Sequence, residues 1–288
     1  MSIKRLLLAC LACFIGFGSA IAEPALWAIR DGKSTIYLFG TFHLLRNGTD
    51  WQSPKIVKAF GRSSEVWLEL LDDDQATMQP LMAQLGMDAA HPLSRRLPVE
   101  ELARLDKRAQ LLGLPGEKAL DGMRPWTASL MLIVAAYQQA GFDPAHGADH
   151  VLKDWAQHDH KTLKAFETAS QQLHFFADLP PAQELDLLGE TLDELNQGPA
   201  KFLAMADAWS KGDVPAITKT FAEFQRPQDR ALYKTLLVNR NQAWAAKLAE
   251  RLQTGTGTSF VAVGAGHLAG PDSLIAALGQ RGIKVQQE

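Results

Sequence analysis

The chain contains the same short pattern twice, a glycine followed three residues later by a histidine. The copies are Gly40-Thr41-Phe42-His43 and Gly264-Ala265-Gly266-His267. Imidazole nitrogens bind divalent metal ions and exchange protons near neutral pH. A single copy is better explained by a histidine that caps a strand end and bonds a backbone carbonyl. Two copies in equivalent positions predict one shared site, in which His43 and His267 hold the same ion.

Each copy follows a buried strand and belongs to a strand–loop–helix–strand unit. Apolar, β-branched and aromatic residues predict these strands at Thr35–Phe39 and Ser259–Val263. The elements that follow are predicted at Pro54–Arg62 and Glu65–Leu70 in the first unit, and at Asp272–Leu278 and Ile283–Val285 in the second. Such units pack as right-handed crossovers with parallel strands, and ligands bind beyond the carboxyl ends of those strands. The predicted fold class is therefore α/β, with a sheet platform built from N- and C-terminal strand–GxxH–helix–strand units.

A large helical insertion, from about residue 75 to 253, separates the two units. One short strand at 161–167 is predicted to rejoin the sheet, and Ala25–Arg30 is predicted to be an edge strand that forms a hairpin at Asp31-Gly32. Helices are predicted at about 181–196, 199–211 and 214–224. The last and longest is predicted from Pro227 to Leu252, with an inward face of Leu232, Leu236, Leu237, Trp244 and Leu248. Residues 23–288 are predicted to form a single domain.

Charged side chains near the predicted strand ends are further candidates for chemistry. Glu69 ends a buried strand, where a carboxylate is costly unless paired, so it is a candidate metal ligand or general base. Glu167 follows the strand at 161–167 and is a second candidate catalytic carboxylate, and Arg240 could clamp a substrate carbonyl. The alternatives are a strand end in solvent for Glu69, a helix cap for Glu167 and a solvated helix face for Arg240. Gly40 and Gly264 would leave room for an ion or substrate.

The first 22 residues read as a secretory signal peptide. Lys4 and Arg5 precede an apolar run too short to span a membrane, and Ala20-Ile21-Ala22 predicts cleavage after Ala22. The expected location is the periplasm or the exterior, and no transmembrane segment is expected in the mature chain. Both cysteines, Cys10 and Cys13, lie in this segment. Any metal must therefore be held by imidazole and carboxylate groups.

Composition and motifs exclude several functional classes. The formal net charge is −3, and no basic stretch alternates with aromatic residues, so no nucleic-acid partner is expected. No serine lies in a G-x-S-x-G elbow, which disfavours a serine hydrolase. The sequence gives no prediction of oligomeric state.

Six stretches, in this order, resemble the TraB/GumN family, which is similar to the Tiki metalloproteases of animals. They are Gly40-Thr41-Phe42-His43, the Glu69 strand, Gly147-Ala148-Asp149, Phe166-Glu167-Thr168 with Gln171 and Gln172, Arg240-Asn241, and 260–268. The resemblance covers essentially the whole mature chain. One departure is Phe42, which stands where the family has a smaller residue and predicts a narrower cleft.

The resemblance implies a divalent-metal site formed by the two GxxH histidines and acidic residues. Tiki proteins cleave peptide bonds, with manganese or cobalt supporting activity. By position, His43, His267 and Glu69 match the site residues, and Glu167 and Arg240 match further family positions. Asp149 and Asn241 are placed with substrate binding.

The expected function is a periplasmic hydrolase that uses a divalent metal (Mn, Co or Zn) and acts on a peptide or protein. One alternative is a non-catalytic protein of the same fold that binds metal, haem or a peptide. A second alternative is a structural interaction protein. Because one fold can host several functions, the geometry of the site has to discriminate among them.

Overall fold

The computed structural model describes residues 23–222 and 230–288. The predicted signal peptide, the end of the helix predicted at 214–224, and Pro227 lie outside the described residues. A six-stranded sheet has the order β6-β4-β7-β2-β1-β8. Its strands are β1 (Leu26–Arg30), β2 (Ser34–Thr41), β4 (Glu65–Leu68), β6 (Thr162–Ala165), β7 (Gly257–Gly264) and β8 (Val285–Gln287). Only β1 runs against the others, and the prediction of a mixed α/β fold is confirmed.

The centre of the sheet joins segments from opposite ends of the chain. β2 and β7 pair in parallel over their full length, and the last pair in register is Thr41 with Gly264. Both strands therefore end at the same edge of the sheet. The residues that follow them, which carry His43 and His267, leave the sheet side by side.

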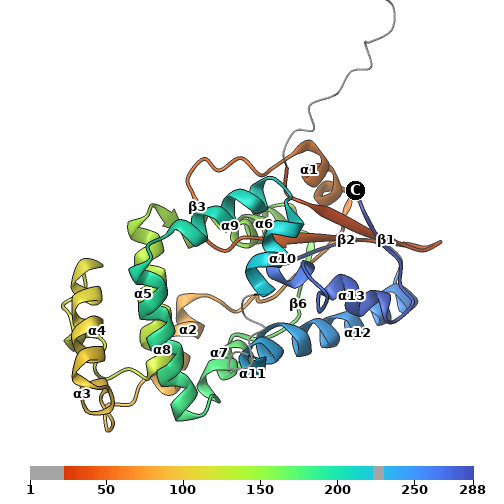
Figure 1. The fold of residues 1–288 in the computed structure, drawn as a ribbon. Helices are drawn as coiled ribbons and strands as arrows, with labels where there is room; N and C mark the ends of the chain where they lie inside the picture. Colours follow the sequence, from red (N-terminus) through yellow and green to blue (C-terminus); the bar gives the residue numbers. More distant parts are fainter. Residues whose placement is uncertain (1–22, 223–229) are drawn as a thin grey trace, which may run out of the picture.

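Successive side chains of β2 and β7 point to opposite faces of the sheet, and each face packs against an apolar core. Tyr37, Phe39 and Phe260 contribute to one apolar core, whereas Leu38 and Val261 contribute to another on the opposite face. The first core includes residues of α1 (Pro54–Arg62), α6 (Ala148–His158), α9 (Ala200–Ser210) and α10 (Val214–Ala222). The second includes residues of α12 (Asn239–Thr254) and α13 (Leu274–Gly279). Figure 1 shows α1 on one side of the strands and α12 and α13 on the other.

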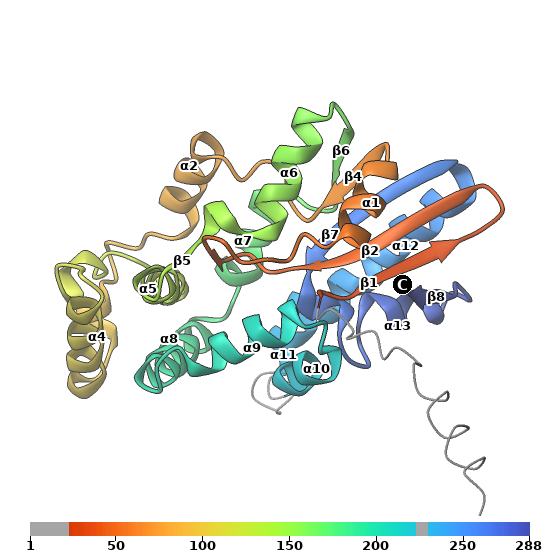
Figure 2. The same cartoon turned by 90° about the horizontal axis from the view of Figure 1, so that it is seen from above.

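A separate helical cluster extends away from the sheet (Figures 1 and 2). It contains α3 (Leu93–Arg96), α4 (Val99–Leu111), α5 (Pro125–Gln139) and α8 (Pro181–Asn196), which share a third apolar core. Apart from short 3₁₀ turns, the remaining described elements are α2 (Gln75–Leu85), α7 (Ala169–Ala177), α11 (Arg230–Tyr233), a π-helical segment (Lys234–Val238), and the short pair β3 (Leu45–Arg46) and β5 (Phe142–Asp143). Over 23–222 and 230–288, none of the helices combines the length and apolarity that crossing a bilayer requires.

The hairpin prediction was right in its pairing and wrong about the edge. β1 pairs with β2 in antiparallel fashion, as Asp31-Gly32 predicted. It is not an edge strand, because β8 pairs with its outer side. The ion pair between Arg30 and Glu288 (2.7 Å) fastens that outer strand. A local turn signal identifies the partner of a strand on one side only, and the second partner comes from the far end of the chain.

Candidate functional site

The two GxxH segments lie against each other just beyond the sheet. His43 follows the end of β2, and His267 lies in a 3₁₀ turn, Ala265–Leu268, directly after β7. A Cβ atom on Gly40 would lie 3.0 Å from the Cα atom of Ala265. Gly40 therefore permits close packing of the two segments, instead of leaving the room for a ligand that the sequence predicted. The indole of Trp209 fixes this strand end by donating to the Gly40 carbonyl (2.7 Å).

Three predicted side chains surround one small volume beside Gly264. A Cβ atom on Gly264 would lie 3.1 Å from His43 Nε2, 3.3 Å from Glu69 Oε1 and 3.7 Å from His267 Cδ2. Glu69 follows the last residue of β4, and its Oε1 accepts a hydrogen bond from the Gly264 amide (2.7 Å). Residues more than 200 positions apart in the chain thus converge at this point, and the absence of a side chain at Gly264 keeps it open.

Each histidine is oriented by an oxygen atom at Nδ1. His267 Nδ1 lies 2.7 Å from Asn241 Oδ1, and Asn241 Nδ2 donates to the carbonyl of Asp272 (2.8 Å). Because that carbonyl can only accept, the amide orientation is settled and His267 Nδ1 must carry the hydrogen. His43 Nδ1 lies 3.0 Å from Asp149 Oδ2. Both rings therefore turn Nε2 away from these partners and toward the neighbourhood of Glu69.

Asp149 reaches His43 because the start of α6 packs on the first GxxH segment. The amide of Ala148 donates to the Phe42 carbonyl (3.0 Å), and a Cβ atom on Gly147 would lie 2.4 Å from the His43 carbonyl oxygen. Only glycine fits there. Asp149 and Asn241 were expected to bind substrate. In the structure both side chains instead contact a histidine, and Asn241 is buried.

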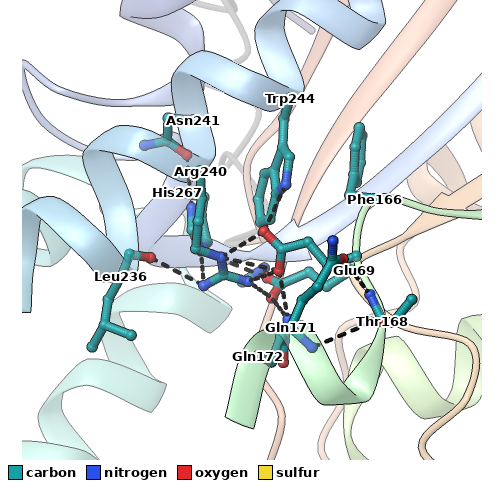
Figure 3. Close-up of polar contacts among 12 residues, drawn as sticks. Glu69, Phe166, Thr168, Gln171, Gln172, Leu236, Arg240, Asn241, Trp244 and His267 are labelled. Atoms are coloured by element: carbon teal, nitrogen blue, oxygen red, sulfur yellow. Dashed lines mark hydrogen bonds and ion pairs between the residues drawn. The ribbon is translucent and has the colours of Figure 1, made fainter. Parts of the chain in front are cut away.

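Arg240 is the central cation of the site (Figure 3). Its Nη2 donates to Glu69 (2.6 Å) and Glu167 (2.9 Å), and its Nη1 lies 3.1 Å from His267 Nε2. The side chain is 11% exposed, and its guanidinium lies over the ring of Trp244 at 4.7 Å. The predicted alternative of a solvated helix face is wrong.

A π-helical segment, Lys234–Val238, directly precedes α12, of which Arg240 is the second residue. The amide of Asn239 bonds the Lys234 carbonyl, five residues back, instead of the usual four. The carbonyl of Leu236 accepts a hydrogen bond from Arg240 Nη1 (3.0 Å). The backbone therefore helps to aim the guanidinium, as π-helical turns often do near functional sites.

Glu167 holds Arg240 in place. Its carboxylate accepts from Arg240 Nε (2.9 Å), from the Trp244 indole (3.0 Å) and from the Gln172 amide (3.0 Å). Gln172 also donates to Glu69 (3.1 Å) and so links the two carboxylates. Sequence reasoning gave Gln172 and Trp244 no role in the site. The available signal was the spacing of Arg240 and Trp244, which puts both on one side of a helix.

Burial and neighbouring charges fix the protonation of the inner groups. Burial lowers the pKa of His267 to about 3, so the ring is neutral at neutral pH. Burial alone would raise the pKa of Glu69, but its position between His267 and the Arg240 guanidinium lowers that pKa to about 2. The Asp149 carboxylate raises the pKa of the half-exposed His43 above its ordinary value.

Two cavities open at His43 and Glu69. One of about 530 Å³ has walls from α7, α8, α9, α10 and the α11–π segment, and its lining includes His43, Glu69, Arg240 and His267. The other, of about 580 Å³, shares His43 and Glu69 with the first. Within the described part of the chain, no three His, Cys, Asp or Glu side chains are already grouped as a metal would require.

Comparison with known proteins assigns the family. The model of the TraB/PrgY/gumN family matches residues 25–287, which include every candidate residue above. The chain belongs to the TraB/PrgY/gumN family. The predicted resemblance to the TraB/GumN family is thereby confirmed.

Curated relatives match most of the chain at low identity. The uncharacterized protein YbaP of Escherichia coli (strain K12) is 26% identical over 263 residues, which are 89% of this chain and 92% of YbaP. An uncharacterized protein of Treponema pallidum (strain Nichols) is 23% identical over 270 residues, which are 88% of this chain and 79% of that protein. No solved structure matches the chain.

Phe42 lies in an aromatic cluster. Its ring centroid is 5.1 Å from that of Phe202 and 5.8 Å from that of Trp209. It is buried and also lines the 530 Å³ cavity. The side chain between Thr41 and His43 therefore contributes to the cavity wall.

Proposed function

We propose that this chain is an exported, divalent-metal-dependent hydrolase that cleaves peptide bonds. The observation that carries the proposal is the paired orientation of the two histidines. An oxygen acceptor on each Nδ1 leaves both Nε2 atoms for the volume that Glu69 also faces. Such outer partners are the usual companions of metal-binding histidines, since they fix the tautomer and the ring orientation.

The donor groups fit a divalent ion in type, and His267 and Glu69 also fit in protonation state. His43, His267 and Glu69 supply nitrogen and oxygen ligands, which suit manganese, cobalt or zinc. His267 is neutral and Glu69 is ionised, and metal ligation requires both of these forms. His43, whose pKa is raised by Asp149, would release its proton on binding the ion. To hold an ion, His267 would exchange its contact with Arg240, whose guanidinium keeps its bonds to Glu69, Glu167 and Leu236.

The residues of the site would divide the work as follows. When bound, a divalent ion supplies Lewis-acid chemistry, polarising a carbonyl and acidifying water. The low pKa of Glu69 favours a ligand over a general base, because a good base titrates near the working pH. Once released from His267, Arg240 Nη1 could donate a hydrogen bond to a substrate carbonyl or to its oxyanion. Asp149 and Asn241 would keep the imidazoles aimed.

A metal-dependence assay tests this proposal. The purified protein is treated with a chelator and then assayed on a peptide library with manganese, cobalt or zinc. The His43→Ala variant is expected to lose cleavage about 10²-fold or more, because one ligand is gone. The matched control is His158→Ala, whose side chain is 89% exposed and bonds only its neighbour Asp159 among the described residues. Equal activity in the parent protein and in His43→Ala would refute the proposal.

Gly264→Ala is expected to lower activity strongly without unfolding the protein. Its methyl group would occupy the volume between His43 Nε2 and Glu69 Oε1, at 3.1 and 3.3 Å. The backbone of Gly264 has φ −49°, which alanine adopts freely. We expect about a 10²-fold loss of kcat/KM with little change in Tm. Gly61→Ala is the control, since its Cβ would meet nothing within 4 Å.

A second candidate function is metal or ligand binding without catalysis. The observation that favours it is the contact between Arg240 Nη1 and His267 Nε2, which occupies a lone pair that an ion would use. A protein that retains metal but cleaves no member of a broad peptide library would support this function over hydrolysis.

A further inference from the structure

The two cavities at the site differ in the share of charged and apolar groups that line them. Apolar side chains of several helices dominate the 530 Å³ cavity, among them Phe175, Met205 and Leu237. The 580 Å³ cavity is instead bordered by charged groups, including Asp73, Asp149 and Lys153. We call them the apolar cavity and the polar cavity.

Four side chains line both cavities: Thr41, His43, Glu69 and Gln172. Two of these, His43 and Glu69, are the groups to which we assign the chemistry. A bond held at this shared wall therefore has an apolar space on one side and a polar space on the other.

The hydroxyl of Thr41 indicates which kind of ligand would bind across the wall that the two cavities share. Thr41 is 1% exposed, and its Oγ1 has no hydrogen-bond partner among the described residues. A buried hydroxyl without a partner is costly, so a ligand that bonds it gains affinity. A peptide backbone offers N–H and C=O groups to such a hydroxyl, whereas an acyl tail offers neither.

We propose that the substrate is a peptide with large apolar residues on one side of the cleaved bond and polar residues on the other. This inference rests on the proposed function. The apolar cavity falls within the usual volume range of ligand sites and exceeds the size of one side chain. Binding a large apolar side chain there, compared with a small one, is expected to raise kcat/KM about 10- to 100-fold. Peptides with acidic residues on the polar side are disfavoured, because the aspartates that border that cavity (Asp73, Asp74 and Asp149) outnumber its one lysine, Lys153.

The inference is tested by comparing cleavage of two peptides in which the apolar and polar halves are exchanged. Two quenched fluorescent peptides carry the same residues, one with a Phe-Leu half before a Ser-Lys half and the other with the halves exchanged. Because the two cavities lie on different sides of the shared wall, one order is expected to be cleaved about 100-fold faster than the other. Equal cleavage of both orders would overturn this inference and leave the hydrolase proposal standing.

Two substitutions at Met205 tie the preference to the apolar cavity. Met205→Lys places a charge in the wall and is expected to lower kcat/KM for the preferred peptide about tenfold or more. Met205→Ala should fold even where the lysine variant does not, and it should shift the preference from leucine toward tryptophan. The control is Met131→Lys on α5, where the side chain is 39% exposed and lines neither cavity. An unchanged preference in Met205→Ala would contradict the assignment.

Binding measurements separate this inference from the proposed function. Fluorescence anisotropy of end-labelled peptides reports the order preference without any cleavage. Preferential binding with no cleavage at any metal concentration would support the apolar cavity assignment and refute the hydrolase. Displacement of the peptide by laurate at lower concentration than by an unlabelled apolar peptide would overturn the peptide assignment in favour of an acyl chain.

Discussion

Replacement of Glu69 by glutamine is expected to lower peptide turnover about 10³-fold. Glutamine keeps the shape of the side chain and an acceptor for the Gly264 amide, but it removes the negative charge beside both histidines. A neutral amide is a poor ligand for a divalent ion compared with a carboxylate. Steady-state kcat and KM on the preferred peptide, with metal content measured on the same samples, would check this prediction.

The matched comparison is Glu167→Gln. Both carboxylates bond Arg240, but only Glu69 lines the two cavities. If Glu69 served only to anchor the guanidinium, the two variants would lose similar activity. We expect Glu167→Gln to lose no more than about tenfold, with metal content retained. Equal losses would instead mean that Glu69, like Glu167, acts only by anchoring Arg240.

The backbone framework of the site could be predicted because its signals are local. An apolar run that stops at glycine marks a strand end, and two such runs with identical spacing to a histidine mark two equivalent ends. The pairing of Thr41 with Gly264 follows once both strands lie in one parallel sheet. The place of Glu69 in the site could also be predicted, since a carboxylate at the end of a buried strand needs a partner.

The partners within the site could not be predicted, because they depend on contacts between distant segments. Nothing near Asp149 indicates that Gly147 lets α6 pack on the carbonyl of His43. Nothing near Glu167 indicates that its partner is Arg240, 73 residues away. Single-sequence patterns report which residues share a face but not which surface that face meets.

The α11–π segment illustrates the same limit. Leu232, Leu236 and Leu237 have the spacing of a helix face and were predicted to point inward. In the structure all three are half-buried and line the apolar cavity. Helical periodicity therefore identified the face correctly, but a core and a ligand cavity present the same apolar pattern.

Removal of the Arg240 guanidinium is expected to cost about 3–5 kcal/mol of unfolding free energy. In Arg240→Met, the carboxylates of Glu69 and Glu167, which are 13% and 10% exposed, would face each other without their shared cation. Urea denaturation followed by circular dichroism would measure the loss. Arg30→Met is the control, since that arginine is 44% exposed and its pair with Glu288 should contribute at most about 1 kcal/mol.

The double variant, Arg240→Met with Glu167→Gln, tests whether the lost stability arises from two buried carboxylates left without a cation. Glu167→Gln alone should destabilise the protein, because it weakens the hold on Arg240. In the Arg240→Met background the same change should restore part of the lost stability, because it removes one of two buried like charges. A reversal of sign between the two backgrounds would identify charge compensation as the role of Arg240. Additive losses would mean that the guanidinium stabilises the site through its packing on Trp244 and Phe175 instead.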